Sequence, residues 1–329
     1  MNNSNCDSFV SIIVPVYNEE KVIIECNHRI KSVMCDIGLN WEVIYINDGS
    51  QDNTLGILYQ LRQEQANIAI IDFSRNFGKE VAMTAGLDFA KGDAVVVIDA
   101  DLQDPPELIK AFVRYWHEGY DVVYGKRSSR RGESIVKKIT SYLFYRVIQK
   151  VTKVQIPSDT GDFRLLSRRA VDALLQMREK NRFMKGLFSW VGYNTKAVLY
   201  ERNSRFAGDT KWNYWRLWNF ALDGLTSFTI APLKIATYIG LLISVLSFFL
   251  ALFFVYKTLM YGDPVKGYPS LMVIILFIGG VQLGCIGLIG EYLGRMFVES
   301  KQRPLYLLKE HLPSAIDENI AYKQEKQHG

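Results

Sequence analysis

Residues 92–108 read GDAVVVIDADLQDPPEL and join an apolar run, an acidic loop and the start of a helical pattern. The Val-rich run Ala94–Ile98 is typical of a buried β-strand, and a proline in the first turn favours a helix over Pro106–Glu118. The same order of apolar run, polar loop and helical pattern recurs through the first 124 residues. This stretch therefore sets the pattern from which the fold is predicted.

Four further apolar runs and three further helical patterns follow this scheme. The predicted strands cover Val10–Val16, Glu42–Asn47, Ile68–Phe73 and Val122–Tyr124, and the predicted helices cover Lys21–Asp36, Thr54–Glu64 and Glu80–Ala90. Strands that alternate with helices predict an α/β fold with a parallel sheet covered on both faces. Ligands of such folds bind beyond the carboxyl ends of the strands. After Asp162 the strand pattern fades.

Two uncharged segments in the C-terminal half predict membrane-spanning helices. Residues 235–256 and 267–290 contain no Asp, Glu, Lys or Arg, and about 20 apolar residues suffice for a helix to cross the hydrocarbon core. A pair of buried core helices is the alternative, but soluble helices of this length rarely lack every charge. Lysine and arginine residues are more frequent outside the two segments than between them, which predicts that both termini are cytosolic. Glycines in the second segment allow close helix packing, either against the first segment or against another subunit in a homo-oligomer.

These segments divide the chain into five parts. We predict a cytosolic α/β domain over residues 1–205, a juxtamembrane amphipathic segment over 206–232, spans over 233–257 and 268–290, and a cytosolic tail over 291–329. Within the first part, apolar, aromatic and basic residues at helical spacing predict an interfacial helix at about residues 134–152, with a helix packed on the sheet as the alternative.

Composition and short motifs exclude several classes of protein. The 329 residues carry a net charge of +5, which is too small to indicate nucleic-acid binding. The four cysteines form no metal-binding pattern and indicate free thiols in a reducing compartment. The N-terminus lacks the features of a signal peptide. No GxGxxG follows the first predicted strand, which disfavours a dinucleotide-dependent dehydrogenase.

Asp99 and Asp101 are the strongest candidates for binding chemistry. Residues two apart in an extended segment point the same way, so both carboxylates can face one ion. Two like charges this close need a cation between them, and Mg²⁺ or Mn²⁺ with water and substrate phosphates suits hard oxygen ligands. Gln103 follows the same alternation and supplies a neutral oxygen. The predicted metal ligands are therefore Asp99, Asp101 and Gln103.

Several blocks, in order, resemble the family 2 glycosyltransferases that load polyprenyl phosphate with a sugar. They are SIIVPVYNEE (11–20), INDGSQDNT (46–54), SRNFGKEVAMTAG (74–86), DADLQDPPEL (99–108), GDFRLLSRRA (161–170) and RFAGDTKWNYW (205–215), followed by the two spans. The chain resembles in particular the bactoprenol glucosyltransferases of O-antigen (lipopolysaccharide) modification and, more distantly, dolichol-phosphate mannose synthase. The resemblance implies a GT-A fold, a Rossmann-like nucleotide-sugar domain, with interfacial amphipathic helices and a two-helix transmembrane hairpin.

The resemblance also implies which residues bind the donor and carry the reaction. The base and ribose of a nucleotide-sugar would contact Pro15, Tyr17, Glu19, Ile46 and Asp48. The cluster that binds the nucleotide and the metal would be Asp99, Ala100, Asp101 and Gln103. The phosphates would contact Arg127, Arg205 and Lys211. The implied catalytic residues are Asp101 and Asp162. For Asp162 three roles stay open: a base, a group that holds a sugar hydroxyl, or a structural partner of Arg164 or Arg168.

The implied activity is an inverting transfer of a hexose, in first place glucose from UDP-glucose, to undecaprenyl phosphate at the cytosolic face of a bacterial inner membrane. The same reaction with mannose or an aminoarabinose-type sugar is one alternative, and a noncatalytic membrane scaffold is another. A processive polysaccharide synthase is disfavoured because the chain contains no Arg-Trp pair. A flippase and a downstream glycosyltransferase are the implied partners in the pathway.

Overall fold

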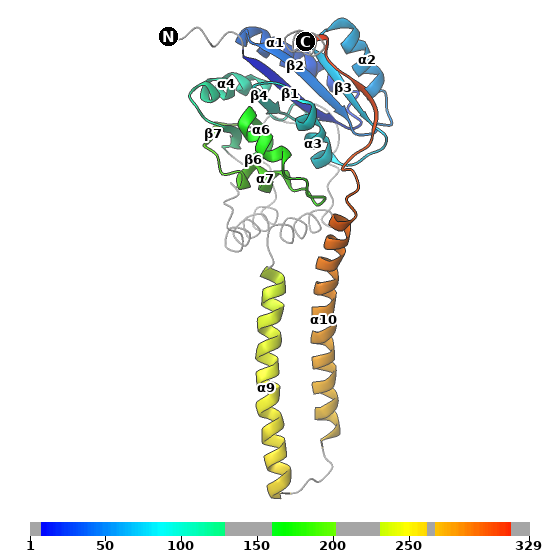
Figure 1. The fold of residues 1–329 in the computed structure, drawn as a ribbon, viewed down its shortest axis with the longest axis vertical. Coiled ribbons are helices and arrows are strands. Elements are labelled where there is room, and N and C mark those ends of the chain that lie inside the picture. The colour runs from blue at the N-terminus through cyan, green and yellow to red at the C-terminus, as the bar shows by residue number, and fades with distance from the viewer. Residues whose placement is uncertain (1–7, 129–159, 202–230, 262–266, 317–329) are drawn as a thin grey trace, which may run out of the picture.

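Two long helices extend from an α/β domain (Figure 1). The computed structural model describes residues 8–128, 160–201, 231–261 and 267–316. The predicted interfacial helix at 134–152, the juxtamembrane segment up to residue 230, and the predicted phosphate ligands Arg205 and Lys211 lie outside the described residues.

Eight strands form one sheet, whose order in space is β7-β5-β6-β4-β1-β2-β3-β8. The strands are β1 (Phe9–Val16), β2 (Asn40–Asn47), β3 (Ile68–Phe73), β4 (Ala94–Val97), β5 (Val122–Arg127), β6 (Thr160–Ser167), β7 (Thr195–Tyr200) and β8 (Leu308–Leu312). The first five confirm the five predicted strands.

The prediction of a purely parallel sheet is wrong. Neighbouring strands from β4 through β1 and β2 to β3 are parallel, but β6 is antiparallel to both β4 and β5, and β8 is antiparallel to β3. The strand pattern also does not end at Asp162, because β6 and β7 both belong to the sheet. In β6, Asp162 and Arg164 interrupt the apolar run that usually reveals a central strand.

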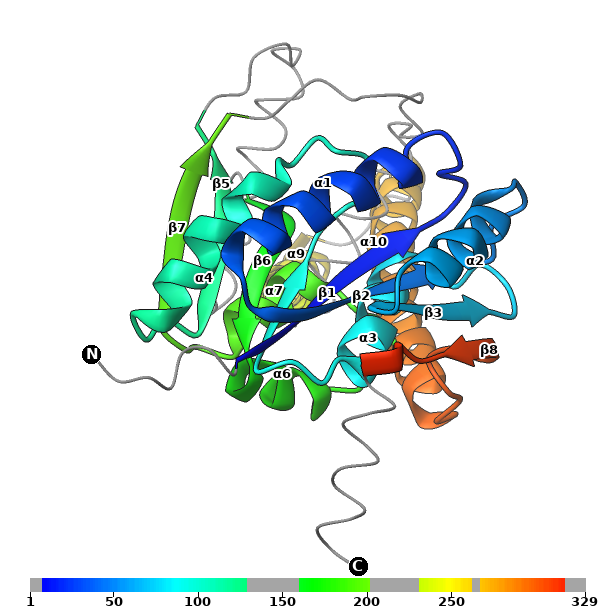
Figure 2. The ribbon, with the colours of Figure 1, turned by 90° about the horizontal axis from the view of Figure 1, so that it is seen from above.

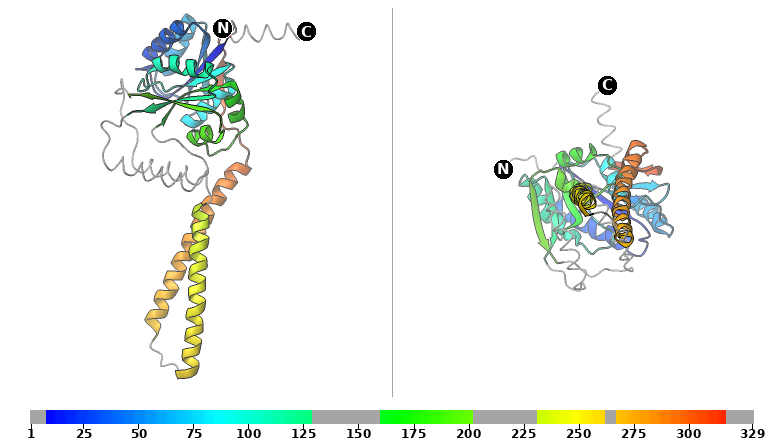
Figure 3. Two further views of the ribbon diagram at one scale, coloured as in Figure 1. Left: turned by 90° about the vertical axis from the view of Figure 1, so that its left-hand side faces the viewer. Right: turned by 90° about the horizontal axis from the view of Figure 1, so that it is seen from below.

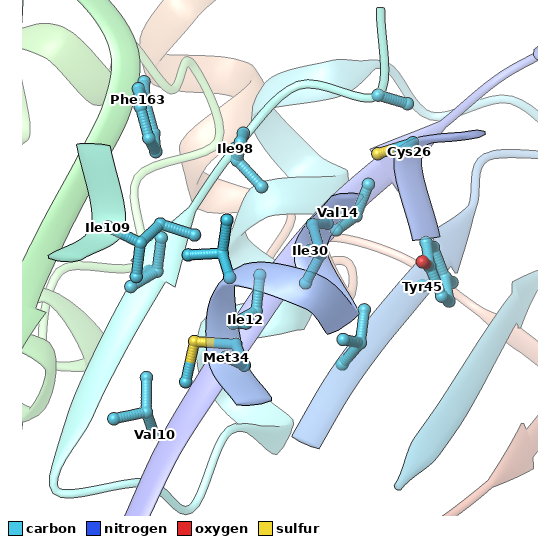
Figure 4. Close-up of a cluster of buried hydrophobic side chains, with 14 of the residues drawn as sticks. Val10, Ile12, Val14, Cys26, Ile30, Met34, Tyr45, Ile98, Ile109 and Phe163 are labelled. Carbon is cyan, nitrogen blue, oxygen red and sulfur yellow. The ribbon is translucent and has the colours of Figure 1, made fainter. Parts of the chain in front are cut away.

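Helices cover both faces of the sheet, as predicted. One face is covered by α1 (Ile23–Ile37), α2 (Thr54–Glu64) and α4 (Ile109–His117), and the 3₁₀ turn η2 (Pro106–Leu108) directly precedes α4. The other face is covered by α3 (Lys79–Phe89), α6 (Arg168–Leu175) and α7 (Met184–Trp190) (Figure 2). Alternation along β1 explains the two cores: Ile12 packs in the cluster that contains Ile30 and Met34 of α1 (Figure 4), whereas Ile13 packs in the cluster with α3.

Two long helices, α9 (Ala231–Tyr261) and α10 (Tyr268–Ser300), leave the same side of the domain (Figures 1 and 3). Large apolar side chains are exposed on both, including Leu246 and Phe253 on α9 and Leu283 on α10. Among the described residues, Phe277–Ser300 alone has the length and hydropathy to cross a membrane. Two helices are thus present where two were predicted, but a pair of membrane spans is not confirmed.

The segment predicted as a cytosolic tail returns to the α/β domain. β8 pairs with β3, with Ile71 opposite His311, and forms the edge of the sheet. Beyond β8, the hydroxyl of Ser314 donates a hydrogen bond to the buried carboxylate of Glu42 at 3.0 Å. The sheet is therefore built from residues on both sides of the long helices, and not from residues 1–205 alone. The edge of the sheet is thereby moved from β3 to the short, charged strand β8.

Candidate active site

Four strands bring the predicted acidic residues to one edge of the sheet. β1, β2 and β4 are parallel, so their carboxyl ends meet at this edge. β6 is antiparallel to β4, with Val97 opposite Arg164, and its first residues therefore lie beside the loop that follows β4. Asp99 of that loop and Asp162 of β6 come together in this way, around a shared lysine.

Lys79, the first residue of α3, joins these two carboxylates. Its Nζ lies 2.6 Å from Oδ1 of Asp99 and 2.5 Å from Oδ2 of Asp162. The exposed fractions of the side chains are 42% for Lys79, 24% for Asp99 and 12% for Asp162. Oδ1 of Asp162 is buried and has no hydrogen-bond partner among the described residues. The cluster is thus open on the side of Lys79 and most enclosed at Asp162.

Burial and charge oppose each other at these three groups. Burial alone would raise the pKa of Asp162, but Lys79 and Lys185 hold that pKa well below its usual range. Burial raises the pKa of Asp99; Lys79 opposes this shift, and the negative charge of Asp162 reinforces it. Burial would lower the pKa of Lys79, but the two carboxylates raise it above its ordinary value. Lys79 and Asp162 therefore form an ion pair at neutral pH.

The neighbouring arginines do not pair with the carboxylate of Asp162. Arg164 donates from Nε to the backbone carbonyl of Asp162 at 3.2 Å and from Nη2 to that of Gly161 at 2.9 Å. Arg168 donates to the backbone carbonyls of Ala90 and Gly92. Within the described residues, neither arginine forms an ion pair with the Asp162 carboxylate, whose partner is Lys79.

Asp48, which follows β2, fixes the loop that carries Lys79. Its Oδ1 accepts a hydrogen bond from the N–H of Phe77 at 2.6 Å, and its Oδ2 accepts one from the N–H of Gly78 at 2.9 Å. Gly78 has φ 97°, a conformation that favours glycine. A side chain at Gly49 would meet the backbone of the same loop at 2.7 Å, so the two loops are tightly packed. Burial raises the pKa of Asp48, which the two N–H donors oppose.

The loop after β4 forms a sharp acidic turn. The N–H of Gln103 donates to Oδ1 of Asp101 at 3.1 Å. Leu102 between them has φ 56°, and its buried side chain anchors the turn in the core. The charge of Asp101 also contributes, after burial and Asp162, to the raised pKa of Asp99, so the acidic groups act on one another.

This acidic turn fits a divalent cation that takes most of its ligands from elsewhere. Within the described residues, no three His, Cys, Asp or Glu side chains are grouped so that they could hold a metal ion. Mg²⁺ is commonly bound by one or two carboxylates and completed by water and substrate phosphates, which a two-aspartate turn can satisfy. Because Lys79 contacts both oxygens of Asp99, Asp101 is the stronger candidate of the two carboxylates.

Arg127, predicted to bind a phosphate, ends β5 at the same edge. The hydroxyl of Tyr200, at the end of β7, donates to the buried carboxylate of Asp104 and accepts a hydrogen bond from Arg127. Burial would lower the pKa of Arg127, but Tyr200, Asp104 and Asp99 raise it. Nε of Arg127 is buried and has no hydrogen-bond partner in the described parts of the chain. Arg127 therefore belongs to the same electrostatic cluster as Asp99.

The loops after β1 and β2, predicted to bind the nucleotide, are joined to each other. The N–H of Asn18 donates to Oγ of Ser50 at 3.0 Å. Three predicted residues are half-buried along this edge, namely Pro15, Tyr17 and Glu19. Ile46 is fully buried and Ala100 nearly so, because both pack in the core. Their side chains therefore offer a nucleotide almost no surface.

Three side chains at this edge are absent from the sequence prediction: Lys79, Glu80 and Tyr200. Glu80 accepts a hydrogen bond from the N–H of Met184 at 2.9 Å, and burial, with the charge of Asp162, raises its pKa to about 7. The signal for Lys79 and Glu80 was a charged pair at the start of an apolar helix, within a block that carries the family resemblance. Tyr200 ends a half-exposed edge strand and has no comparable signal.

Comparison with known proteins identifies the family of this chain. Residues 11–175 match the model of glycosyl transferase family 2, and residues 231–296 match that of the GtrB C-terminal hairpin. An uncharacterized glycosyltransferase of Synechocystis sp. is 54% identical over 92% of this chain and 95% of its own length. A bactoprenol glucosyl transferase of Shigella phage SfV is 46% identical over 91% of this chain and 98% of its own length.

Among solved structures, mannosyl-3-phosphoglycerate synthase from Rubrobacter xylanophilus is 17% identical over 66% of this chain and 71% of its own, with a TM-score of 0.46. The family of this chain is assigned from the family model and the similar full-length sequences, and not from this solved structure. The sheet, its acidic edge and these matches define a glycosyltransferase with a GT-A type fold. The chain belongs to glycosyl transferase family 2.

Proposed function

We propose that this glycosyltransferase transfers a hexose, in first place glucose from UDP-glucose, to undecaprenyl or another polyprenyl phosphate. The observation that carries the proposal is the presence, in one chain, of a family 2 domain and the GtrB C-terminal hairpin. The near full-length similarity to a bactoprenol glucosyl transferase supports both the lipid acceptor and the choice of glucose.

The long helices support a membrane-bound acceptor. We propose that α9 and α10 both span the inner membrane of a bacterium and that the α/β domain lies in the cytosol. Exposed apolar side chains on both helices favour this arrangement. Withdrawing a lipid tail from the bilayer costs about 0.8 kcal/mol per CH₂ group, so the enzyme has to bring its site to the membrane surface.

The clustered charges suit the proposed chemistry. As the sugar leaves the nucleotide, negative charge develops on the leaving diphosphate, and nearby cations lower the barrier. Arg127 lies at the acidic edge, and Arg205 and Lys211 remain the other proposed phosphate ligands. A Mg²⁺ or Mn²⁺ ion, when bound, would neutralise part of that charge. Asp101, with Gln103 and Asp99 beside it, is the proposed metal-binding group.

A strong base is not required for attack by the acceptor. The second pKa of a phosphate monoester is about 6, so the acceptor is largely dianionic at neutral pH. We propose that Asp162 orients the acceptor or a sugar hydroxyl and takes up any remaining proton. A single displacement would invert the configuration at the anomeric carbon. The product would be a lipid-linked sugar that a flippase and a further glycosyltransferase can use.

A donor panel tests this function. Purified protein in detergent is mixed with Mg²⁺ and one of UDP-glucose, GDP-mannose or a UDP-aminoarabinose, with or without undecaprenyl phosphate, and release of the nucleotide diphosphate is measured. We expect release from UDP-glucose that depends on the lipid. Lipid-dependent release from another donor alone would support transfer to the lipid but with a sugar other than glucose. No lipid-dependent release from any donor would favour a noncatalytic scaffold.

A further inference from the structure

Lys79 stands between two acidic residues that belong to different parts of the reaction. Asp99 lies in the acidic turn proposed for the donor, and Asp162 lies on β6, where the acceptor is proposed to bind. The single ammonium group of Lys79 is within 2.6 Å of both carboxylates. Without this cation, two carboxylates from adjacent strands would face each other in a half-buried site, which is unfavourable.

Lys79 also leaves the two oxygens of Asp162 unequal. Oδ2 is occupied by Lys79 at 2.5 Å, whereas Oδ1 is buried and unpartnered among the described residues. A buried carboxylate oxygen without a donor costs free energy, so a ligand that supplies a hydrogen-bond donor or a proton there is favoured. By holding Oδ2, Lys79 therefore fixes the orientation of the Asp162 carboxylate.

We propose that Lys79 is a positioning residue for sugar transfer: its ammonium holds the Asp162 carboxylate by Oδ2 and so leaves Oδ1 as the oxygen that accepts a hydrogen bond or a proton from a substrate. The inference rests on the proposed function, since it assigns Lys79 a part in the same transfer. It distinguishes Lys79 from the arginines of the site, which would bind phosphate directly.

The support of Lys79 is rigid enough for this role. Lys79 directly follows Gly78, whose N–H is held by Asp48, and it starts α3. The next residue, Glu80, is tied to α7 by the N–H of Met184. Both neighbours of Lys79 in the chain are therefore fixed, and its ammonium is held by Asp99 and Asp162. Pre-organised supports of this kind are what positioning within an active site requires.

In the described parts of the chain, no other cation replaces Lys79 at Asp162. Arg164 uses its guanidinium for the backbone carbonyls of residues 161 and 162 and stacks on the ring of Phe188 at 3.8 Å. Lys185 contributes positive charge near Asp162, but within the described residues it forms no ion pair with that carboxylate. Removal of Lys79 would therefore leave Asp162 either protonated or turned away, and in both states Oδ1 is no longer presented as a fixed acceptor.

A double-mutant cycle tests the proposal. The variants are Lys79→Met, Lys79→Arg, Asp162→Asn and the double variant Lys79→Met with Asp162→Asn. Lys110→Met is the matched control, because Lys110 is also an ion-paired lysine, 49% exposed, and lies on α4 away from the site. For each protein, kcat and KM for undecaprenyl phosphate are measured, together with the Kd for UDP-glucose in the presence of Mg²⁺.

We expect Lys79→Met to lower kcat by about 100-fold, the usual size of a lost proton-transfer or orienting group, with donor Kd unchanged within about threefold. Lys79→Arg should recover most of the rate, since it keeps the charge. The double variant should be no slower than the slower single variant, because residues that act as a unit are not additive. Activity of the wild type and of Lys110→Met in the same assay tests the proposed function. If both are active, the results for the Lys79 variants test the role of Lys79 alone.

Two results would overturn the proposal. Weaker donor binding by Lys79→Met with kcat unchanged would make Lys79 a donor-phosphate ligand. Multiplicative losses in the double variant would show that Lys79 and Asp162 act independently.

Discussion

The N–H of Gly78 lies 2.9 Å from Oδ2 of Asp48, and this hydrogen bond links the end of β2 to the residue directly before Lys79. The other carboxylate oxygen accepts from Phe77, so one side chain fixes two successive backbone groups. A residue predicted to bind nucleotide thus also builds the loop that completes the acidic edge.

Asp48→Asn should therefore destabilise the protein and impair transfer together. An amide has only one acceptor oxygen, so one of the two N–H groups would lose its partner in a buried setting, at a cost of about 1–3 kcal/mol. Thermal unfolding in detergent and kcat are measured in parallel. Asp36→Asn, at a 61% exposed carboxylate, is the control. Unchanged stability of Asp48→Asn would show that the loop does not depend on Asp48.

Asp101→Asn should remove sugar transfer and leave the fold intact. The substitution deletes one negative charge at the proposed metal site, and loss of one such electrostatic group typically costs about 100-fold or more in rate. The amide oxygen can still accept from the N–H of Gln103, so the turn is kept. Transfer is followed with undecaprenyl phosphate and UDP-glucose over a range of Mg²⁺ concentrations. Near-normal turnover would contradict the assignment of Asp101.

Glu80→Gln should stabilise the protein at high pH and not at low pH. The pKa of Glu80 is raised from 4.5 to about 7, so the folded state holds this proton more tightly than the unfolded state. The stability contributed by the protonated carboxyl is complete below about pH 4.5 and is lost as the pH rises towards 7.

A glutamine is neutral throughout and can still accept from the N–H of Met184. The stability of Glu80→Gln relative to wild type should therefore rise by up to about 3 kcal/mol between pH 5 and pH 8. Denaturant unfolding at several pH values measures this difference. A difference that stays constant with pH would contradict the raised pKa.

Removal of residues 304–329 should destabilise the α/β domain although it leaves the acidic edge untouched. The truncation deletes β8 and exposes the edge of β3. It also deletes Ser314, the donor to Oε2 of buried Glu42, and the acceptor Glu310, to which the Tyr59 hydroxyl donates at 2.6 Å. A lower melting temperature and more aggregation are expected. The control ends after Ile316 and keeps these contacts; equal behaviour of the two truncations would show that β8 adds nothing.

The first half of the sheet could be predicted because its strands carry their own signal. β1, β2, β3 and β4 are buried on both faces and read as Val- and Ile-rich runs. β8 carries no such signal: LKEHL is polar and exposed, and only its pairing with β3, more than 200 residues earlier in the chain, makes it a strand. The antiparallel insertion of β6 likewise depends on a long-range partner.

The acidic half of the site could also be predicted, because Asp99 and Asp101 follow a recognisable strand. The role of Lys79 in the site could not be predicted, because a lysine at the start of a helix is equally typical of a solvated surface. Its role appears only when the fold places β4, β6 and α3 at one edge. Ile46 shows the converse limit: its motif predicts a contact with the nucleotide, but the motif alone does not reveal that the Ile46 side chain is buried in the core.

The central claim is that the chain moves a hexose onto a polyprenyl phosphate. The most direct measurement is the mass of the lipid recovered after wild-type protein is incubated with undecaprenyl phosphate, UDP-glucose and Mg²⁺, with Asp101→Asn as the control. We predict a lipid heavier by one hexose residue with the wild type and unchanged lipid with Asp101→Asn. Unmodified undecaprenyl phosphate with the wild type, under conditions where a bactoprenol glucosyl transferase glucosylates it, would contradict the account.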